Sequence, residues 1–240
     1  MVLLLALPLT LRVGAGLTAA RFLGEFLTDG ERRWLSATTP EPVVATVALE
    51  AGGTATLWRP PRKPPWRGLV LVHGLTPDGK DDPRLQWAAR LLARTGLAVI
   101  APELPGLRNL RLSPDDAAPV AAAARRLAAD PGVGRAPLIV VSISVAAGPV
   151  LAALADPGPG APVELLVTLG GYADARELVR YFTTGAYAQG TVSGQRQIDP
   201  ALVQAFLARN LDLVRDPAAR ALAANTDPGR VDALLAALPP

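Results

Sequence analysis

The apolar residues of this chain fall into short continuous runs separated by stretches with helical spacing. Four runs stand out: GLVLVHG (68–74), LAVIAP (97–102), APLIVVSIS (136–144) and VELLVTLGGY (163–172). A strand of a parallel sheet is buried on both faces and therefore lacks the polar alternation of a half-exposed strand. Each run predicts one such strand.

The stretches between these runs predict helices. Residues 83–95 place Leu85 and Ala89 on one face, and residues 113–129 begin with a serine cap at Ser113 followed by acidic residues in the first turn. A small-residue helix follows residue 144 directly. This alternation predicts an α/β fold, with a mostly parallel sheet, helices on both faces and right-handed crossovers.

The flanking segments complete the predicted organisation. Residues 43–49 and 54–58 are separated by a glycine-containing turn and predict a strand pair, preceded by a turn-rich linker over 28–42. Beyond residue 172 we expect helices and loops without a further strand, forming a helical cap over the strand ends. The expected helices cover 175–183, 200–213, 217–224 and 229–238. The expected units are an N-terminal segment (1–27), a core (28–172) and a cap (173–240).

The N-terminal segment is apolar, with an uncharged run of eleven residues that ends at Arg12. A membrane span needs about 20 apolar residues, and a signal peptide begins with a positively charged region, which this segment lacks. Three interpretations remain: a weak anchor, a span that starts upstream, and a helix packed on the domain. Because residues 1–11 show no polar face, we favour membrane association over the packed helix, and otherwise expect a cytoplasmic protein.

Composition removes several classes of function. The net charge is +3, but the basic residues are scattered singly or in pairs among acidic ones, so nucleic-acid binding is not expected. The chain has no cysteine and a single histidine, His73, which excludes thiolate chemistry and a histidine-rich metal site. Neither a G-x-x-x-x-G-K-[ST] loop nor a G-x-G-x-x-G turn is present. No metal or nucleotide cofactor is implied.

One strand-to-helix junction has the features of a nucleophile elbow. In such an elbow the residues two before and two after the nucleophile must be small, because strand and helix backbones nearly touch. Ser144 is flanked in this way by Ser142 and Ala146, whereas Ser142 would be flanked by the bulkier Val140. Ser144 is therefore the candidate nucleophile, although the pattern S-I-S-V-A lacks both glycines of G-x-S-x-G, and an ordinary serine in a turn is the alternative.

A second segment, His73-Gly74-Leu75-Thr76, follows the first buried strand. An oxyanion hole takes one backbone N–H from the residue after the nucleophile, here Val145, and the other from a loop of this kind, where we expect Leu75 to donate. Gly74 allows the loop to approach closely. Both segments lie at carboxyl ends of strands, where open α/β sheets bind ligands.

These motifs resemble the α/β-hydrolase superfamily, particularly bacterial dienelactone hydrolases and esterases. The resemblance covers about residues 40–175, including the P-x-L-P-G turn at 102–106. It implies a serine hydrolase that acts on carboxylic esters or related acyl substrates, with Ser144 as nucleophile and Leu75 and Val145 as oxyanion donors.

The sequence departs from the superfamily in its acid and base. The expected order is Ser, then Asp or Glu, then His, but no histidine follows Ser144. For His73 we favour a structural role over that of a base. Asp174 is a candidate acid, with a helix cap as the alternative, and Glu103 is expected to make a loop hydrogen bond. The triad is therefore incomplete in this sequence.

Two explanations account for the incomplete triad. Either the chain lacks its last strands together with the acid and base, or it is a non-catalytic relative that binds a ligand or partner in the same cleft. We favour the first, because an uncovered sheet edge promotes aggregation.

Overall fold

The computed structural model describes residues 2–50, 52–155 and 161–213, and its centre is a six-stranded sheet. The strand order is β1-β2-β4-β3-β5-β6. The first two strands pair antiparallel, β2 pairs antiparallel with β4, and the remaining four run parallel. The strands are β1 (Val43–Ala48), β2 (Thr54–Arg59), β3 (Arg67–Val72), β4 (Leu97–Pro102), β5 (Leu138–Ile143) and β6 (Val163–Leu169). The predicted strand pair, the four predicted strands of the parallel sheet and the α/β class are confirmed.

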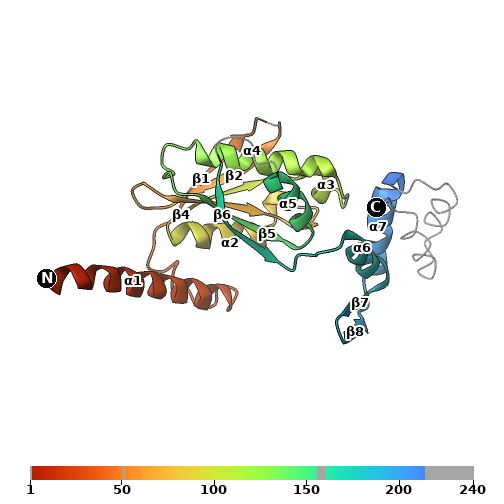
Figure 1. Ribbon diagram of the computed structural model, residues 1–240, viewed down its shortest axis with the longest axis horizontal. Helices are drawn as coiled ribbons and strands as arrows, with labels where there is room; N and C mark the ends of the chain where they lie inside the picture. Colours follow the sequence, from red (N-terminus) through yellow and green to blue (C-terminus); the bar gives the residue numbers. More distant parts are fainter. Residues whose placement is uncertain (1, 51, 156–160, 214–240) are drawn as a thin grey trace.

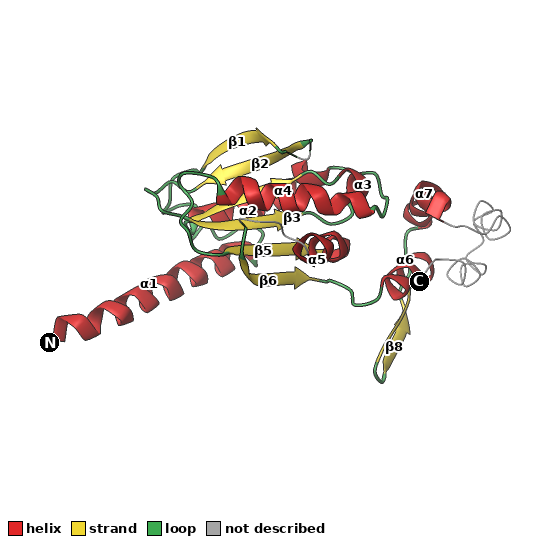
Figure 2. Cartoon of the chain, turned by 45° about the horizontal axis from the view of Figure 1, so that its top comes forward, coloured by secondary structure: helices red, strands yellow, loops and turns green. Residues whose placement is uncertain are grey.

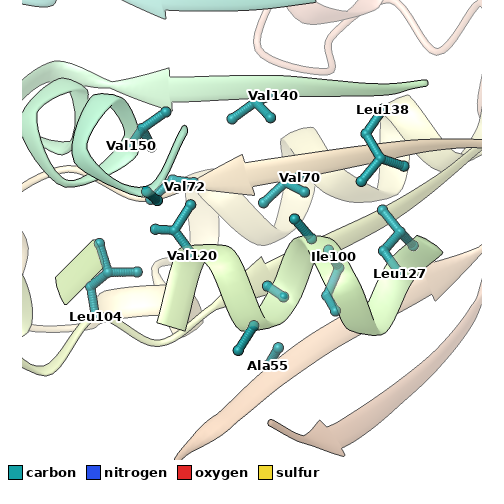
Figure 3. Close-up of a cluster of buried hydrophobic side chains, with 14 of the residues drawn as sticks. Ala55, Val70, Val72, Ile100, Leu104, Val120, Leu127, Leu138, Val140 and Val150 are labelled. Atoms are coloured by element: carbon teal, nitrogen blue, oxygen red, sulfur yellow. The ribbon is translucent and has the colours of Figure 1, made fainter. Parts of the chain in front are cut away.

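Helices cover both faces of this sheet (Figures 1 and 2). Helix α2 (Pro83–Arg94) packs on one face through Leu85, Ala89 and Ala93. Helices α4 (Ala117–Ala128) and α5 (Ala147–Ala155) pack on the other, where Figure 3 shows the core side chains. Strand side chains alternate between the two cores, as the period of a β-strand requires. Thus Val70 and Val72 join the core under α4, and Leu69 and Leu71 join the core under α2.

The order of the strands fixes where a ligand can approach. The chain passes from β3 to β4 on one side of β3 and then returns to β5 on its other side. The loops that leave the carboxyl ends of β3 and β5 therefore diverge, the first to α2 on one face and the second to α5 on the other. A crevice forms between such loops at a topological switch point.

Helix α1 (Val2–Phe26) precedes the sheet and ends against α2. Its last residue, Phe26, stacks on Trp87 of α2 with ring centroids 5.4 Å apart, and Phe22 stacks on Phe26. The buried carboxylate of Glu25 accepts the backbone N–H groups of residues 35 and 36, which ties the following turns to the helix. This end of α1 thus matches the packed-helix alternative. No helix in the described part of the chain is long and apolar enough to cross a membrane, and membrane attachment stays a prediction.

The segment after β6 leaves the sheet and lies beyond the strand ends (Figures 1 and 2). Helices α6 (Ala175–Thr184) and α7 (Pro200–Asn210) confirm two predicted helices. The expectation of no further strand is wrong, because β7 (Ala186–Gln189) and β8 (Val192–Gln195) form a hairpin. Its turn is made possible by Gly190, whose φ of +58° is accessible mainly to glycine. The helices expected at 217–224 and 229–238 lie outside the described residues.

Short helical turns complete the description. They are η1 (Gly79–Asp81), α3 (Pro105–Arg108), η2 (Pro114–Asp116), η3 (Ser144–Ala146) and η4 (Leu211–Leu213).

Strand β6 differs from its neighbours in burial. It is the last strand of the sheet, and Leu165 and Leu169 are 47% and 53% exposed. The apolar run at 163–172 predicted a strand buried on both faces, which is wrong for β6: it is the end strand of the sheet, and side chains on it are left exposed by the described elements. The apolar side chains of β6 would be more stable if they were buried, but the described elements leave them partly exposed.

Candidate active site

Ser144 lies at a sharp turn between β5 and the helix that follows. The strand ends at Ile143, and Ser144 opens the helical turn η3, which continues directly into α5. Its φ is +54°, a left-handed conformation that costs free energy for any residue with a β-carbon. A nucleophile elbow holds its serine in such a strained strand-to-helix turn. The backbone of Ser144 therefore has the conformation that the elbow hypothesis requires.

The positions around Ser144 leave room only for small side chains. Ser142 and Ala146 are fully buried, and the hydroxyl of Ser142 has no hydrogen-bond partner among the described residues. The burial of these two small residues agrees with the size rule for an elbow. The size rule accounts for both departures from G-x-S-x-G.

The loop after β3 packs directly against this elbow. A β-carbon placed on Gly74 would lie 3.1 Å from the carbonyl oxygen of Ile143 and 3.4 Å from the β-carbon of Ser144. Any larger side chain at residue 74 would therefore push the two segments apart. The structure brings together His73-Gly74-Leu75-Thr76 and Ser144, which the sequence analysis placed at one edge of the sheet.

Both expected oxyanion donors belong to these two segments. Val145 is the second residue of η3, so its N–H is among the first of a helix, which have no carbonyl partner within the helix. Leu75 lies in the loop beside it, and both residues carry apolar side chains that pack on the main core. The helix N-terminus adds a partial positive charge that favours an anion at this point.

His73 is fixed by hydrogen bonds on both ring nitrogens. The backbone N–H of Leu104 donates to Nε2 at 3.1 Å, Glu103 Oε1 lies 3.4 Å from the same nitrogen, and Nδ1 lies 2.8 Å from the carbonyl oxygen of Gly74. The ring is buried and joins the Gly74 loop to the P-x-L-P-G turn. With both nitrogens engaged, His73 has no free lone pair for the Ser144 proton. This geometry favours the structural role.

The P-x-L-P-G turn is itself held by a residue that the sequence analysis treated only as an acid in a first helical turn. The buried carboxylate of Asp116 accepts the N–H groups of Gly106 and Leu107 at 2.9 and 3.0 Å. Burial raises the pKa of Asp116 in spite of these two bonds. Glu103 pairs with Arg108 at 3.0 Å, which agrees with the loop role expected for it. The turn that binds His73 is thus held by the Asp116 carboxylate and by the Glu103–Arg108 ion pair.

Asp174 lies at the start of α6. Its carboxylate accepts the N–H of Arg176 at 2.7 Å, so it caps the helix as the alternative interpretation held. It is exposed and does not line the cavity beside Ser144. A role as catalytic acid stays a prediction.

A cavity of about 460 Å³ opens at Ser144 and the Gly74 loop. Its apolar walls come from four segments: the β3 loop (Leu75), the β5 end (Ile143), helix α2 (Leu85, Trp87, Ala88) and helix α6 (Phe182). Phe26 and Asp29, from the end of α1 and the turn that follows it, complete one side. The sequence analysis did not find these last residues, because no periodic signal links an N-terminal helix to a loop 50 residues later.

Asp82 and Arg84 are the paired charges of the lining. Asp82 caps α2 and accepts from Arg84 through both carboxylate oxygens, at 3.1 and 2.7 Å. The hydrogen bond from Arg84 is the main reason why the pKa of Asp82 falls to about 2. The hydroxyl of Thr76 also donates to this carboxylate at 3.3 Å, which links the oxyanion loop to the start of α2.

Comparison with known proteins finds no matching family model and no matching curated protein. Similar solved structures include a hypothetical protein from Pseudomonas aeruginosa, 25% identical, with a TM-score of 0.45 over 63% of this chain and 47% of that one. A dienelactone hydrolase-like promiscuous phosphotriesterase from metagenomic libraries is 19% identical, with a TM-score of 0.43 over 55% of this chain and 60% of the other. An acylaminoacyl peptidase of Pyrococcus horikoshii is 14% identical, with a TM-score of 0.46 over 62% and 26%.

The chain spans about a quarter to three fifths of the length of these three structures. Other similar structures include a lipase and further esterases. The strand order, the helices on both faces and the elbow after β5 are on their own sufficient to assign the fold. The chain has the α/β-hydrolase fold, and the proteins that it resembles include dienelactone hydrolase-like enzymes, esterases and lipases.

Proposed function

We propose that the chain is a serine-hydrolase-type protein that acts on carboxylic esters or related acyl compounds, with Ser144 as nucleophile. The observation that carries this proposal is the left-handed backbone of Ser144 in a tight strand-to-helix turn, pressed against Gly74. A non-glycine residue is held in such a conformation only where the surrounding structure enforces it, and strained residues of this kind cluster at active sites.

The amides of Leu75 and Val145 are the proposed oxyanion donors. Donors fixed in this way act on the charge that develops on the substrate oxygen, and removing one of them from an enzyme costs roughly 10²–10³ in rate. Attack by the Ser144 oxygen on an acyl carbon would form the serine ester, release the alcohol or amine, and transfer the serine proton to a base.

We infer that neither His73 nor Asp174 serves as that base. The only histidine of the chain is engaged at both nitrogens, and Asp174 caps a helix. A serine without a base is a weak nucleophile, yet oxyanion stabilisation and binding alone leave roughly 10³–10⁴ over the reaction in water. We therefore expect slow acylation of Ser144 and poor turnover by this chain alone.

A fluorophosphonate probe tests the proposal, because it requires only attack by the serine oxygen on phosphorus and loss of fluoride. We expect one covalent adduct, located at Ser144 by mass spectrometry and absent in Ser144→Ala. Ser142→Ala is the matched control: its hydroxyl is two residues away, buried and unpartnered among the described residues, so labelling should persist. A folded chain that is not labelled at Ser144 after prolonged incubation would contradict the proposal.

The second candidate is a non-catalytic protein that binds a ligand in the same cavity. The engagement of His73 in two structural hydrogen bonds favours it. In that case ligands should raise the melting temperature of wild type and Ser144→Ala alike, with no covalent adduct in either.

A further inference from the structure

The N-terminal helix contributes an aromatic side chain to the cavity that contains Ser144. Phe26, the last residue of α1, lines this cavity together with Trp87 of α2. The two rings stack on one another with centroids 5.4 Å apart and an angle of 11° between their planes. Phe22 stacks behind Phe26 at 5.5 Å, so three rings form one continuous support.

Without a bound molecule, the exposed part of the Phe26 side chain is unfavourable in free energy, because it leaves apolar surface in water. Its side chain is 36% exposed although it belongs to a stacked pair. Because Trp87 and Phe22 both stack on Phe26, the part of its ring that lines the cavity is what remains for contact with a bound molecule. Aromatic faces favour offset stacking with another ring and pack equally well against an alkyl chain.

The charged side chains that line the cavity offer no uncommitted partner to a ligand carboxylate. Two basic residues line it, Arg84 and His73: the guanidinium is bound by both oxygens of Asp82, and both ring nitrogens of His73 are hydrogen-bonded. Asp29 adds a carboxylate on the same side as Phe26. A ligand carboxylate would thus lose hydration and meet no uncommitted cationic side chain in this lining, which weakens its binding.

We infer that Phe26 and Trp87 form a specificity-determining clamp that takes an uncharged aryl or alkyl group of the substrate and rejects its carboxylate counterpart. This inference rests on the proposed function for the identity of the reacting bond, but the clamp itself binds without reaction. The N-terminal helix is on this basis part of the substrate site, whatever else its first residues contact.

The test separates binding from chemistry by using Ser144→Ala, which cannot be acylated at that residue. Methyl benzoate and benzoate share the ring and differ in charge, and their dissociation constants can be measured by ligand-observed NMR or calorimetry. We expect methyl benzoate to bind and benzoate to bind at least about tenfold more weakly.

Removing either ring should weaken methyl benzoate by about five- to tenfold, the usual effect of one aromatic pair. The variants are Phe26→Ala and Trp87→Ala in the Ser144→Ala background, and Trp87→Phe should restore most of the affinity if the ring itself matters. Leu23→Ala is the matched control, because Leu23 is exposed on the same helix and does not line the cavity. A circular dichroism melt of each variant establishes that it is folded.

Unchanged affinity in Phe26→Ala and Trp87→Ala, or benzoate binding as tightly as its ester, would overturn the clamp. Neither result concerns Ser144, whose reactivity is tested separately with the fluorophosphonate probe. Labelling at Ser144 without ring-dependent binding would leave the proposed function standing and remove the clamp, and the converse result would do the opposite.

Discussion

The carboxyl ends of β3 and β5 and the outer edge of β6 are parts of one sheet with opposite character. The side chains of β3 are buried on both faces, those of β5 are buried or half-buried, the Gly74 loop meets the turn at Ser144 at contact distance, and both ring nitrogens of His73 are hydrogen-bonded. At β6 two leucines are about half exposed, and the next helix begins only at Ala175 with a capping aspartate. The proposed nucleophile Ser144 and the proposed oxyanion loop at Gly74 lie in the first region.

The difference shows that the loops of the candidate site are held in place where the sheet is covered. Parallel strands need cover on both faces, and the covering elements also carry the loops that complete a site. Where cover is present, the loops are fixed and the Ser144 backbone is held in a strained conformation.

The two regions can be compared first by truncating one leucine in each. Leu138 begins β5 and is fully buried, whereas Leu165 on β6 is 47% exposed. Leu138→Ala should lower the free energy of unfolding by about 2–5 kcal/mol, and Leu165→Ala by less than about 0.5 kcal/mol. Urea denaturation measures both. Similar losses in the two variants would mean that β6 is covered in solution.

His73 can be tested as a structural residue rather than a base. His73→Ala removes the acceptor of the buried Leu104 N–H and the donor to the Gly74 carbonyl. We expect a loss of about 2–4 kcal/mol in the free energy of unfolding, because a buried amide is left unpaired and a cavity forms. A variant with unchanged stability would show that the ring is free, and would reopen its role as a base.

The contact between the Gly74 loop and the turn at Ser144 can be disrupted by a substitution at residue 74 alone. Gly74→Val places carbon atoms against the carbonyl of Ile143, which must move the loop away from Ser144. Fluorophosphonate labelling should slow by about 100-fold, equivalent to about 2.7 kcal/mol of lost stabilisation. Gly14→Ala is the control, because a β-carbon there meets no described atom within 4 Å and labelling should not change. Equal rates for Gly74→Val and wild type would remove Leu75 as a donor.

The smallest expected effect concerns the start of α2. The pKa of Asp82 is lowered to about 2 by Arg84, so its contribution to stability is present above the ordinary carboxyl pKa and is lost as pH falls toward 2. Asp82→Asn keeps a capping side chain but should lose this pH dependence, with a difference of up to about 1 kcal/mol at neutral pH. Thermal melts between pH 2 and 5 measure it. Parallel melting curves for the two proteins would contradict the assignment of the charge pair.

Much of the arrangement follows from local sequence. The four apolar runs, the serine cap before α4 and the small residues on each side of Ser144 are short-range features, and each predicts its structure directly. The β7–β8 hairpin escaped prediction because its strands have four residues each and little apolar alternation. Its formation depends on the turn at Gly190 more than on pattern.

The residues of the candidate site also fall into two groups, those predicted from local sequence and those that depend on distant contacts. Ser144, Gly74 and His73 were found because their chemistry depends on neighbours in sequence at the end of a strand. Phe26 and Asp116 were missed because their roles depend on contacts that no periodicity encodes, one across the cavity to Trp87 and the other to amide groups of a separate turn.

The sequence by itself determined the fold class, the order of the strands and helices along the chain and the identity of the candidate nucleophile, since these depend on hydrophobic period, capping and side-chain size within a few residues. Only the tertiary structure decided that both nitrogens of His73 are occupied, that β6 is left half exposed and that the N-terminal helix reaches the cavity. Those properties arise from packing between segments distant in sequence, where the free energy depends on which surfaces meet.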